Sequence, residues 1–229
     1  MLPCPDGRRR HRTRQQEVEH ILVGGQPRLR VCVLECVSIT PPGGTPQRIG
    51  SLQQKIMLTL VVAYRDRSVS VDRIADELWG EHRPHRWLPG IRTLANNLRR
   101  KAGDRNFIHW TGRGYRLHRD ENAVETDIEF MVRFAGEARV ALEEHRFDDA
   151  EVAARRALSC YGGGPWTTDA WYWGDLAADA YVLLGQALLA KADYLACLLE
   201  LSRAPEELEG HDGLRTCLDR AKRATVVAV

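Results

Sequence analysis

Apolar residues recur at two different periods along the chain, and the period changes where one predicted element gives way to another. From Leu29 to Ile39 they are mostly β-branched and closely spaced, which favours short strands. After Ser51 they recur every three or four residues, which predicts helices. A return to short β-type runs between Phe107 and His118 encloses a Gly-Arg-Gly turn, and this pattern predicts a β-hairpin.

Three helices are predicted between the first strands and the hairpin. The first follows Ser51, which forms a capping box with Gln54. The second follows Ser70 as its N-cap and ends at Gly80, and the third runs roughly over 88–102 and stops before a glycine. Strands, three helices and a terminal hairpin in under a hundred residues are the layout of a winged-helix domain.

Long Ala-rich and Leu-rich helices are predicted in the second half of the chain. They begin at Thr126, which forms another capping box with Glu129. Small and large apolar positions match two helical pairs of the tetratricopeptide type, with an insertion between the pairs that lengthens the period from Phe147 to Tyr194. A short helix near residues 213–224 then caps the last pair, or a second chain covers the same face. We therefore expect an all-α, tetratricopeptide-like domain here.

Charge divides the chain in the same way as the predicted elements. Residues 28–119 hold 17 basic and 7 acidic residues, a net charge of +10, whereas residues 120–229 hold 11 basic and 21 acidic residues, a net charge of −10. Such an asymmetry indicates that the basic part meets a polyanion. The predicted domains are a flexible basic arm over 1–27, a winged-helix DNA-binding domain over 28–120 and a truncated helical domain over 121–229.

The sequence predicts no enzyme, cofactor or metal site. Cys32 and Cys36 are four residues apart, but zinc needs four ligands and no second pair follows. There is no Gly-rich phosphate loop, no His-Glu-x-x-His motif and no recognisable nucleophile setting. No apolar segment long enough for a signal peptide or a membrane span follows the arginine run of residues 8–14, so we expect a cytoplasmic protein that binds no membrane.

The third helix is the candidate reader of DNA sequence. At about 100° per residue, one face of this helix is apolar, and it consists of Ile91, Leu94, Ala95 and Leu98. The opposite face and its edges carry the predicted DNA-binding residues, which are Arg92, Thr93, Asn96, Asn97, Arg99 and Arg100. Asn pairs with adenine edges in the major groove, and Arg pairs with guanine or phosphate. An ordinary amphipathic surface helix shows the same pattern, so the hairpin and the charge favour DNA.

Arg113 is the candidate contact from the hairpin. It lies between two glycines at the predicted tip, where a side chain projects furthest from the domain. This position suits a minor-groove or phosphate contact. Exposed turn arginines are common, so the assignment depends on the neighbouring helix.

Four stretches of the sequence carry a family resemblance. They are GSLQQKIML over 50–58, VSVDRIADELWG over 69–80, IRTLANNLRRKAG over 91–103 and GRGYRL over 112–117. Together they resemble the Streptomyces antibiotic regulatory protein family, and the resemblance extends over about residues 28–201. It implies an OmpR-type winged helix followed by a bacterial transcriptional activator domain of tetratricopeptide-like helices, here with a shortened C-terminal end.

The resemblance also implies roles for individual residues. Thr93, Asn96, Asn97 and Arg100 occupy recognition-helix positions that face DNA, and Arg113 lies in the wing. Family members often carry a basic residue where this chain has Asn97, so the operator sequence is not implied.

The loop between the second and third helices corresponds to one that contacts RNA polymerase in OmpR-type activators. In this chain it contains His85, Arg86 and Trp87. An exposed Trp87 suits a partner anchor. The alternative is that Trp87 covers the third helix.

The expected function is that of a sequence-specific DNA-binding transcription regulator, an activator. Its expected partners are double-stranded promoter DNA with direct repeats, the RNA polymerase holoenzyme and a second copy of the chain, at least on DNA. The alternative is a helical-repeat adaptor protein whose winged helix mediates protein-protein contacts. The net charge of the basic domain and Arg113 argue against this alternative.

Overall fold

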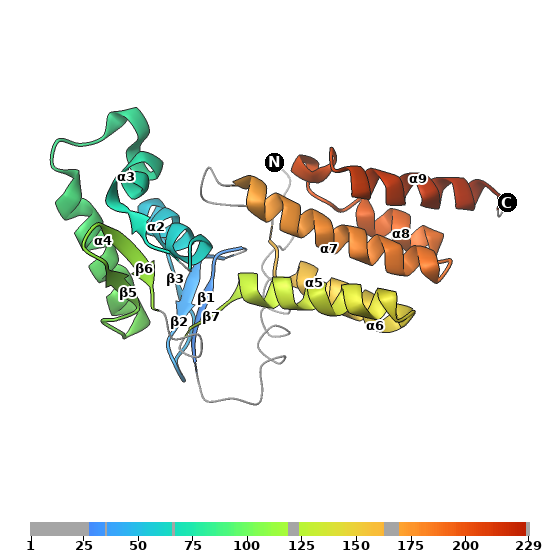
Figure 1. Ribbon diagram of the computed structural model, residues 1–229, viewed down its shortest axis with the longest axis horizontal. Coiled ribbons are helices and arrows are strands. Elements are labelled where there is room, and N and C mark those ends of the chain that lie inside the picture. Colours follow the sequence, from blue (N-terminus) through green and yellow to red (C-terminus); the bar gives the residue numbers. More distant parts are fainter. Residues whose placement is uncertain (1–27, 35, 66, 119–123, 163–169, 228–229) are drawn as a thin grey trace, which may run out of the picture.

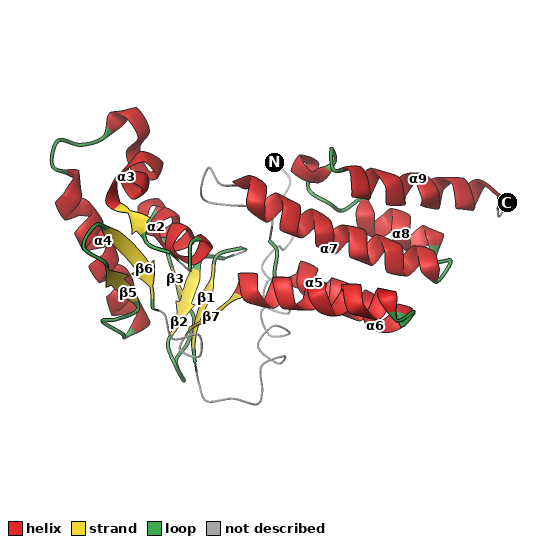
Figure 2. Ribbon diagram, viewed as in Figure 1, coloured by secondary structure: helices red, strands yellow, loops and turns green. Residues whose placement is uncertain are grey.

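The computed structural model contains a mixed region of strands and helices followed by a region of helices alone (Figures 1 and 2). The residues that it describes are 28–34, 36–65, 67–118, 124–162 and 170–227. The arm predicted over residues 1–27 lies outside them. We refer to the described residues of 28–126 as the N-terminal unit and to those of 127–227 as the helical half. This succession confirms the predicted order of an α+β region and an all-α region.

A four-stranded sheet begins the N-terminal unit. Its strand order is β3-β2-β1-β7, and the strands are β1 (Leu29–Cys32), β2 (Ser38–Thr40), β3 (Gln47–Arg48) and β7 (Val124–Thr126). Leu29 and Val31 of β1 are buried and their neighbours are half-buried, as expected for a strand with one face toward a core. Val31 lies opposite Ile39 in the antiparallel β1–β2 pair.

The periodicity does not predict β7. This strand has three residues, too few to show an alternation, and its parallel partner β1 lies at the other end of the N-terminal unit in sequence. β7 leads directly into the first helix of the helical half. The chain therefore enters the helical half from the sheet itself.

Three helices follow the sheet at the predicted places. They are α2 (Leu52–Ala63), α3 (Val71–Trp79) and α4 (Trp87–Ala102), with a 3-10 turn η1 (Gly80–His82) after α3. The Ser51 hydroxyl accepts the Gln54 N–H at 3.5 Å, and the Ser70 hydroxyl accepts the Arg73 N–H at 3.1 Å. Both serines thus satisfy helix N–H groups that have no partner within the helix.

A second sheet contains the predicted hairpin. Its order is β4-β6-β5, with β4 (Val69–Ser70), β5 (Ile108–Trp110) and β6 (Gly114–Leu117). A Cβ atom at Gly114 would lie 2.1 Å from the carbonyl oxygen of Val69 and 2.8 Å from Ser68 Oγ. Glycine is therefore required where the hairpin pairs with β4.

The helical half contains five α-helices among its described residues. They are α5 (Asp127–Glu143), α6 (Phe147–Ser159), α7 (Ala170–Ala190), α8 (Tyr194–Leu201) and α9 (Asp212–Val227), with a 3-10 turn η2 (Glu206–Leu208) before α9. The capping box of Thr126 and Glu129 is present in both directions, as predicted. The final helix α9 is longer than the predicted 213–224.

Successive helices of this half pack side by side, and small residues lie where they cross. Ala138 on α5 and Ala154 on α6 are fully buried. A Cβ atom at Gly185 on α7 would lie 3.0 Å from Leu201 Cδ1 and 3.1 Å from Cys217 Cβ. The absence of a side chain at Gly185 therefore lets α7 approach α8 and α9 closely.

A buried carboxylate joins the helical half to the N-terminal unit. Asp127, the first residue of α5, accepts the N–H groups of Val33 and Leu34 through Oδ2, both at 2.7 Å, and that of Ile128 through Oδ1 at 3.1 Å. Burial raises the pKa of Asp127 to about 7, because desolvation outweighs the opposing effect of these N–H donors. The bonds tie the start of α5 to the loop that follows β1.

Three further contacts strengthen this join. Arg65 donates through Nη2 to the carbonyl oxygen of Val124 at 3.0 Å, and its Nη1 lies 2.5 Å from Glu129 Oε1. The N–H of Gly162, after α6, donates to the carbonyl oxygen of Leu34 at 3.2 Å. One continuous hydrophobic core runs through both regions. The fold thus couples them by packing as well as by hydrogen bonds.

The described residues do not meet what a membrane span or a metal site requires. None of its helices is both long and apolar enough to cross a membrane. The same part brings together no group of three or more His, Cys, Asp and Glu side chains suited to a metal ion. Cys32 and Cys36 are free and half-buried. Burial raises the pKa of the Cys32 thiol, which disfavours the thiolate that zinc requires.

Candidate nucleic-acid interface

Helix α4 is anchored by the apolar face that its sequence predicts. Ile91, Leu94, Ala95 and Leu98 are all buried, and the helix packs against α2 and β5. Figure 1 shows α4 beside β5 and β6, at the end of the molecule away from α8 and α9. The opposite face of α4 is left open to solvent.

The C-terminal end of α4 has a defined geometry. Gly103 adopts the left-handed conformation with φ of 67°, and its N–H donates to the Arg100 carbonyl at 3.3 Å. The N–H of Asp104 donates to the Arg99 carbonyl at 3.2 Å, which completes a Schellman motif. Three basic residues of the last turn, Arg99, Arg100 and Lys101, lie at the negative end of the helix dipole, where cations are favoured.

The polar face of α4 presents most of the predicted reading residues to solvent. Arg92, Thr93, Asn96 and Arg100 are exposed, and Asn97 is half-buried. The amide oxygen of Asn97 accepts from Arg100 Nη2, and that of Asn96 accepts from Arg99 Nη1 at 2.8 Å. The amide NH₂ groups of both asparagines have no hydrogen bond to any described residue. Adenine recognition uses both the amide oxygen and the NH₂ group, and each oxygen has a second lone pair for it beside the bond from arginine.

Arg99 points toward the hairpin instead of the open face of α4. Its Nε and Nη2 donate to the Ile108 carbonyl at 2.8 and 2.6 Å, and its guanidinium lies 5.9 Å from the ring centre of Tyr115. The sequence placed Arg99 at the edge of the polar face, and the structure uses it to tie α4 to β5. The guanidinium also orients Asn96 through the bond between their side chains.

The hairpin presents Arg113 and Trp110 at its tip and edge. The turn is closed by the Thr111 N–H, which donates to the Gly114 carbonyl at 3.0 Å, while Gly112 adopts φ of 91°. Arg113 is exposed, as the Gly-Arg-Gly pattern predicts. Trp110 is 39% exposed and packs on Tyr115 at 5.1 Å between ring centres. Sequence reasoning did not single out Trp110, because its exposure depends on the hairpin register.

The basic side chains of this surface are not paired with acids of the described chain. From Arg86 to the end of the hairpin they are Arg86, Arg92, Arg99, Arg100, Lys101, Arg105, Arg113 and Arg116. None of these eight forms an ion pair with a described residue. We call this set the unpaired basic surface. Like charges that the fold leaves unpaired raise the local positive potential.

The loop between α3 and α4 is held in place by Arg83. Its guanidinium lies 3.2 Å from Asp72 Oδ1, 2.5 Å from Asp76 Oδ1 and 4.7 Å from the ring centre of Trp87. Trp87 is half-buried and packs against the core, so it covers the start of α4 beneath this arginine.

Two neighbours of Trp87 are exposed to solvent. They are His85 and Arg86, the other two residues expected to contact polymerase. Leu88, which the sequence did not single out, is 40% exposed.

Comparisons with known proteins agree with this fold. No protein-family model matches the chain. The regulatory protein AfsR of Streptomyces griseus is 32% identical over 114 residues, which are 50% of this chain and 11% of AfsR. The structure of Mycobacterium tuberculosis EmbR in complex with a low-affinity phosphopeptide is similar with a TM-score of 0.54 and 20% identity, over 89% of this chain and 68% of the EmbR chain. The chain thus shares the EmbR fold and spans about a tenth of the length of AfsR.

Proposed function

We propose that this chain is a sequence-specific DNA-binding transcription regulator whose N-terminal unit is a winged helix. The unpaired basic surface carries the proposal. Eight basic side chains on one helix, its preceding loop and its adjacent hairpin repel one another in the free protein, and DNA phosphates would neutralise them. The similarity to AfsR, a regulatory protein, supports the same reading and the expected Streptomyces antibiotic regulatory protein family.

Helix α4 is proposed to enter the major groove with its exposed polar face. Thr93, Asn96, Asn97 and Arg100 are assigned to base edges, and Arg92 is assigned to phosphate. All of them project from one rigid helix whose other face is buried.

Two arginines near the hairpin have different proposed roles. Arg113 is exposed at the tip and is assigned to the minor groove or to phosphate. Arg99 is assigned to positioning, since its guanidinium holds the helix and the hairpin at a set distance.

The helical half is proposed to be a tetratricopeptide-like activator domain that makes protein contacts. The buried alanines and Gly185 at helix crossings support a repeat architecture. RNA polymerase is the proposed partner of the α3–α4 loop, through exposed His85 and Arg86, with Trp87 serving chiefly to support the loop.

A salt series on the full chain tests DNA binding. We expect the logarithm of the affinity for duplex DNA to fall linearly with the logarithm of salt concentration, because bound cations release counterions from phosphates. Arg113→Ala should reduce the slope by about 1 and weaken all sequences evenly, whereas Asn96→Ala should cost about 1–3 kcal/mol on the best site and relax one base position. Arg139→Ala, an exposed arginine on α5, is the matched control. A flat salt dependence would favour the adaptor alternative.

Operator spacing tests the proposed pairing of two chains on direct repeats. Half-sites about one helical turn apart, roughly 10–10.5 bp, place two chains on the same side of the duplex. Inserting about 5 bp should abolish cooperative binding and transcription activation. Cooperative binding that survives the insertion, or one chain per operator at saturation, would contradict the paired arrangement.

A further inference from the structure

A cavity of about 490 Å³ lies in the helical half, between α6, α7 and α8. Its volume is within the usual range for small-molecule sites, about 300–1,000 Å³. Leu158, Leu184 and Pro205 supply apolar walls, and Tyr161 and Tyr181 add aromatic surface. Arg155, Ser159, Glu200 and Arg203 add polar surface, so the lining would suit a small ligand that has a polar group beside its apolar body.

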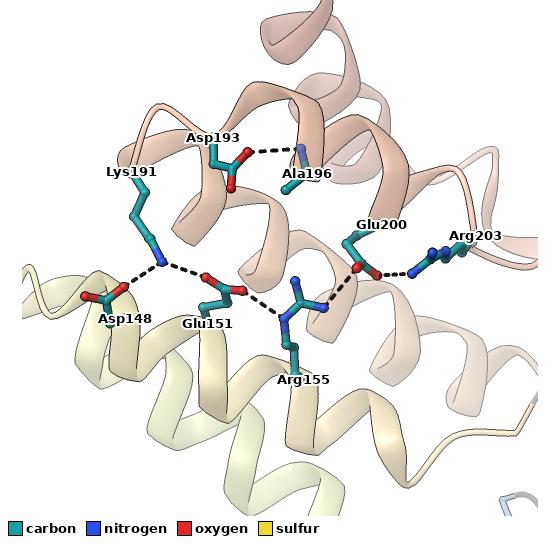
Figure 3. Close-up of polar contacts among 8 residues, drawn as sticks. All are labelled: Asp148, Glu151, Arg155, Lys191, Asp193, Ala196, Glu200 and Arg203. Carbon is teal, nitrogen blue, oxygen red and sulfur yellow. Dashed lines mark hydrogen bonds and ion pairs between the residues drawn. The ribbon is translucent and has the colours of Figure 1, made fainter. Parts of the chain in front are cut away.

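Figure 3 shows a row of alternating charges from α6, the turn between α7 and α8, and α8. Three members of this row, Arg155, Glu200 and Arg203, also line the cavity. Lys191 Nζ lies 2.5 Å from Asp148 Oδ1 and 2.8 Å from Glu151 Oε2. The next cation, Arg155, donates through Nε to Glu151 Oε1 at 2.8 Å and lies 3.0 Å from Glu200 Oε1 through Nη1. Each of these two cations is thus held between two carboxylates.

Arg203 ends the row and breaks this pattern. It lies 3.1 Å from Glu200 Oε2 through Nη1 and has no second carboxylate among the described residues. Its side chain is 68% exposed at the wall of the cavity. Glu200 is shared with Arg155, so the cavity wall carries two guanidinium groups and one carboxylate. The row as a whole holds three cations and three carboxylates and is neutral, so Arg203 offers an incoming anion its exposed N–H donors and not a surplus charge.

We propose that this cavity binds a small molecule with one carboxylate and an apolar body, and that Arg203 receives the carboxylate. Arg203 can offer a planar pair of N–H donors that matches a carboxylate. Lys191 and Arg155 each have two carboxylate partners within the fold, and the ligand would give Arg203 its second one. The site is separate from the unpaired basic surface and does not depend on DNA binding.

Occupation of the cavity can reach the N-terminal unit through one short path. Gly162 lines the cavity, and its N–H donates to the Leu34 carbonyl. The Leu34 N–H in turn donates to Asp127, at the join between the two regions. A ligand that fixes Gly162 therefore restrains the loop after β1.

Binding of 2-naphthylacetate to the full chain tests the site. Its carboxylate matches Arg203 and its ring matches the apolar walls. We expect a dissociation constant of roughly 0.1–1 mM by calorimetry, typical of a ligand of this size. The neutral amide of the same compound should bind about tenfold more weakly, and acetate alone should not bind measurably. No heat at saturating concentration, or equal binding of acid and amide, would overturn the proposal.

Paired arginine variants locate the binding site. Arg203→Leu should weaken 2-naphthylacetate at least about tenfold, and Arg203→Lys should weaken it less, because the charge remains although the planar pair of donors is lost. Arg215→Leu is the matched control, since Arg215 is 65% exposed and also pairs with an acid three residues away. Equal losses in Arg203→Leu and Arg215→Leu would place binding elsewhere.

Hydrogen exchange tests the path to the N-terminal unit. With 2-naphthylacetate bound, the Leu34 and Gly162 amides should exchange several-fold more slowly, because the bonds that join them open less often. Binding with unchanged exchange at both amides would overturn the proposed path.

Discussion

Two clusters of basic side chains, one in each region of this protein, differ in whether the fold pairs them with acids. In the helical half, Arg155 and Lys191 each lie between two carboxylates of the same fold. On α4 and the hairpin, Arg100 and Arg113 have no acidic partner among the described residues. Exposed ion pairs add little to stability, so the pairing in the helical half chiefly balances charge. Charge that a fold leaves unbalanced therefore indicates where an external anion binds.

This contrast also explains why the same residue type has different meanings in the two regions. An unpaired arginine is common on the N-terminal unit and indicates a broad polyanion surface. An arginine with a single carboxylate partner at the end of a paired row, such as Arg203, is the proposed contact of a single small anion. The stability of each region also depends on the contacts between them, among them the hydrogen bonds of Asp127 to Val33 and Leu34.

Removal of the Asp127 carboxylate should lower the free energy of unfolding more than any other substitution considered, and should uncouple the two regions. Asp127→Ala leaves the buried N–H groups of Val33 and Leu34 without acceptors, so the free energy of unfolding should fall by about 3–5 kcal/mol. Urea denaturation followed by circular dichroism measures the loss, and separate transitions for the two regions should appear. Asp179→Ala, an exposed carboxylate on α7, is the control. An Asp127→Ala loss no larger than the control's would show that packing alone joins the regions.

The pH dependence of stability should show the same carboxylate as a titrating group. The pKa of Asp127 is about 7 in the folded chain and has an ordinary value of 3.8, so the folded state binds the extra proton between these values. Its contribution to stability is therefore full below about pH 4, falls as pH rises and is lost above about pH 7, a change of about 2–4 kcal/mol.

Asp127→Asn isolates this contribution, because the side chain no longer titrates. The difference in unfolding free energy between wild type and Asp127→Asn should shrink or change sign as pH rises from 4 to 7. The measurement is a set of urea curves at half-unit steps in pH. A difference that stays constant across this window would mean that Asp127 is already ionised at low pH.

Two glycine substitutions should change stability in opposite directions in the two regions. Gly114→Ala places a Cβ atom against the Val69 carbonyl and should cost about 1–3 kcal/mol. Gly136→Ala in the middle of α5 meets no atom within 4 Å and should stabilise by about 0.5–1 kcal/mol, because alanine loses less entropy in a helix. Thermal and urea unfolding measure both. Loss of stability in Gly136→Ala would indicate a contact on that face of α5.

Neighbouring arginines on α4 should separate positioning from DNA contact. Arg99→Ala removes two bonds to the Ile108 carbonyl and should lower the free energy of unfolding by about 1–2 kcal/mol. Arg100→Ala should change stability by less than about 0.5 kcal/mol and should weaken DNA binding directly. Urea unfolding and DNA titrations of both variants measure the effect on stability and the effect on DNA binding separately. Equal stability losses would remove the distinction between these two arginines.

Local patterns in the sequence anticipated much of the fold and the open face of α4. The burial of Ile91, Leu94 and Leu98 follows from their spacing on a helix, and the capping box of Thr126 follows from a glutamate three residues later. Of the capping box predicted at Ser51, the structure shows only the bond from the Gln54 N–H to the Ser51 hydroxyl. The exposed Arg113 follows from glycines on both sides of it. These features depend on neighbours within a few residues, which the sequence states directly.

Contacts between residues far apart in sequence could not be predicted in this way. The pairing of β7 with β1 joins segments at opposite ends of the N-terminal unit. The direction of Arg99 depends on where the hairpin returns beside α4, and the role of Asp127 depends on two N–H groups of a distant loop.

By itself, the sequence determined the kinds of elements, their order, their buried faces and the division of charge between the regions. Only the tertiary structure decided which charges are paired. Lys191, Arg155 and Arg203 are all basic residues in the sequence, yet the packing of α6 against α7, which α8 follows, gives the first two a pair of carboxylates each and Arg203 only one. The physical reason is that helix propensity and amphipathic period act over a few residues, whereas ion pairing depends on distances between elements that only packing sets.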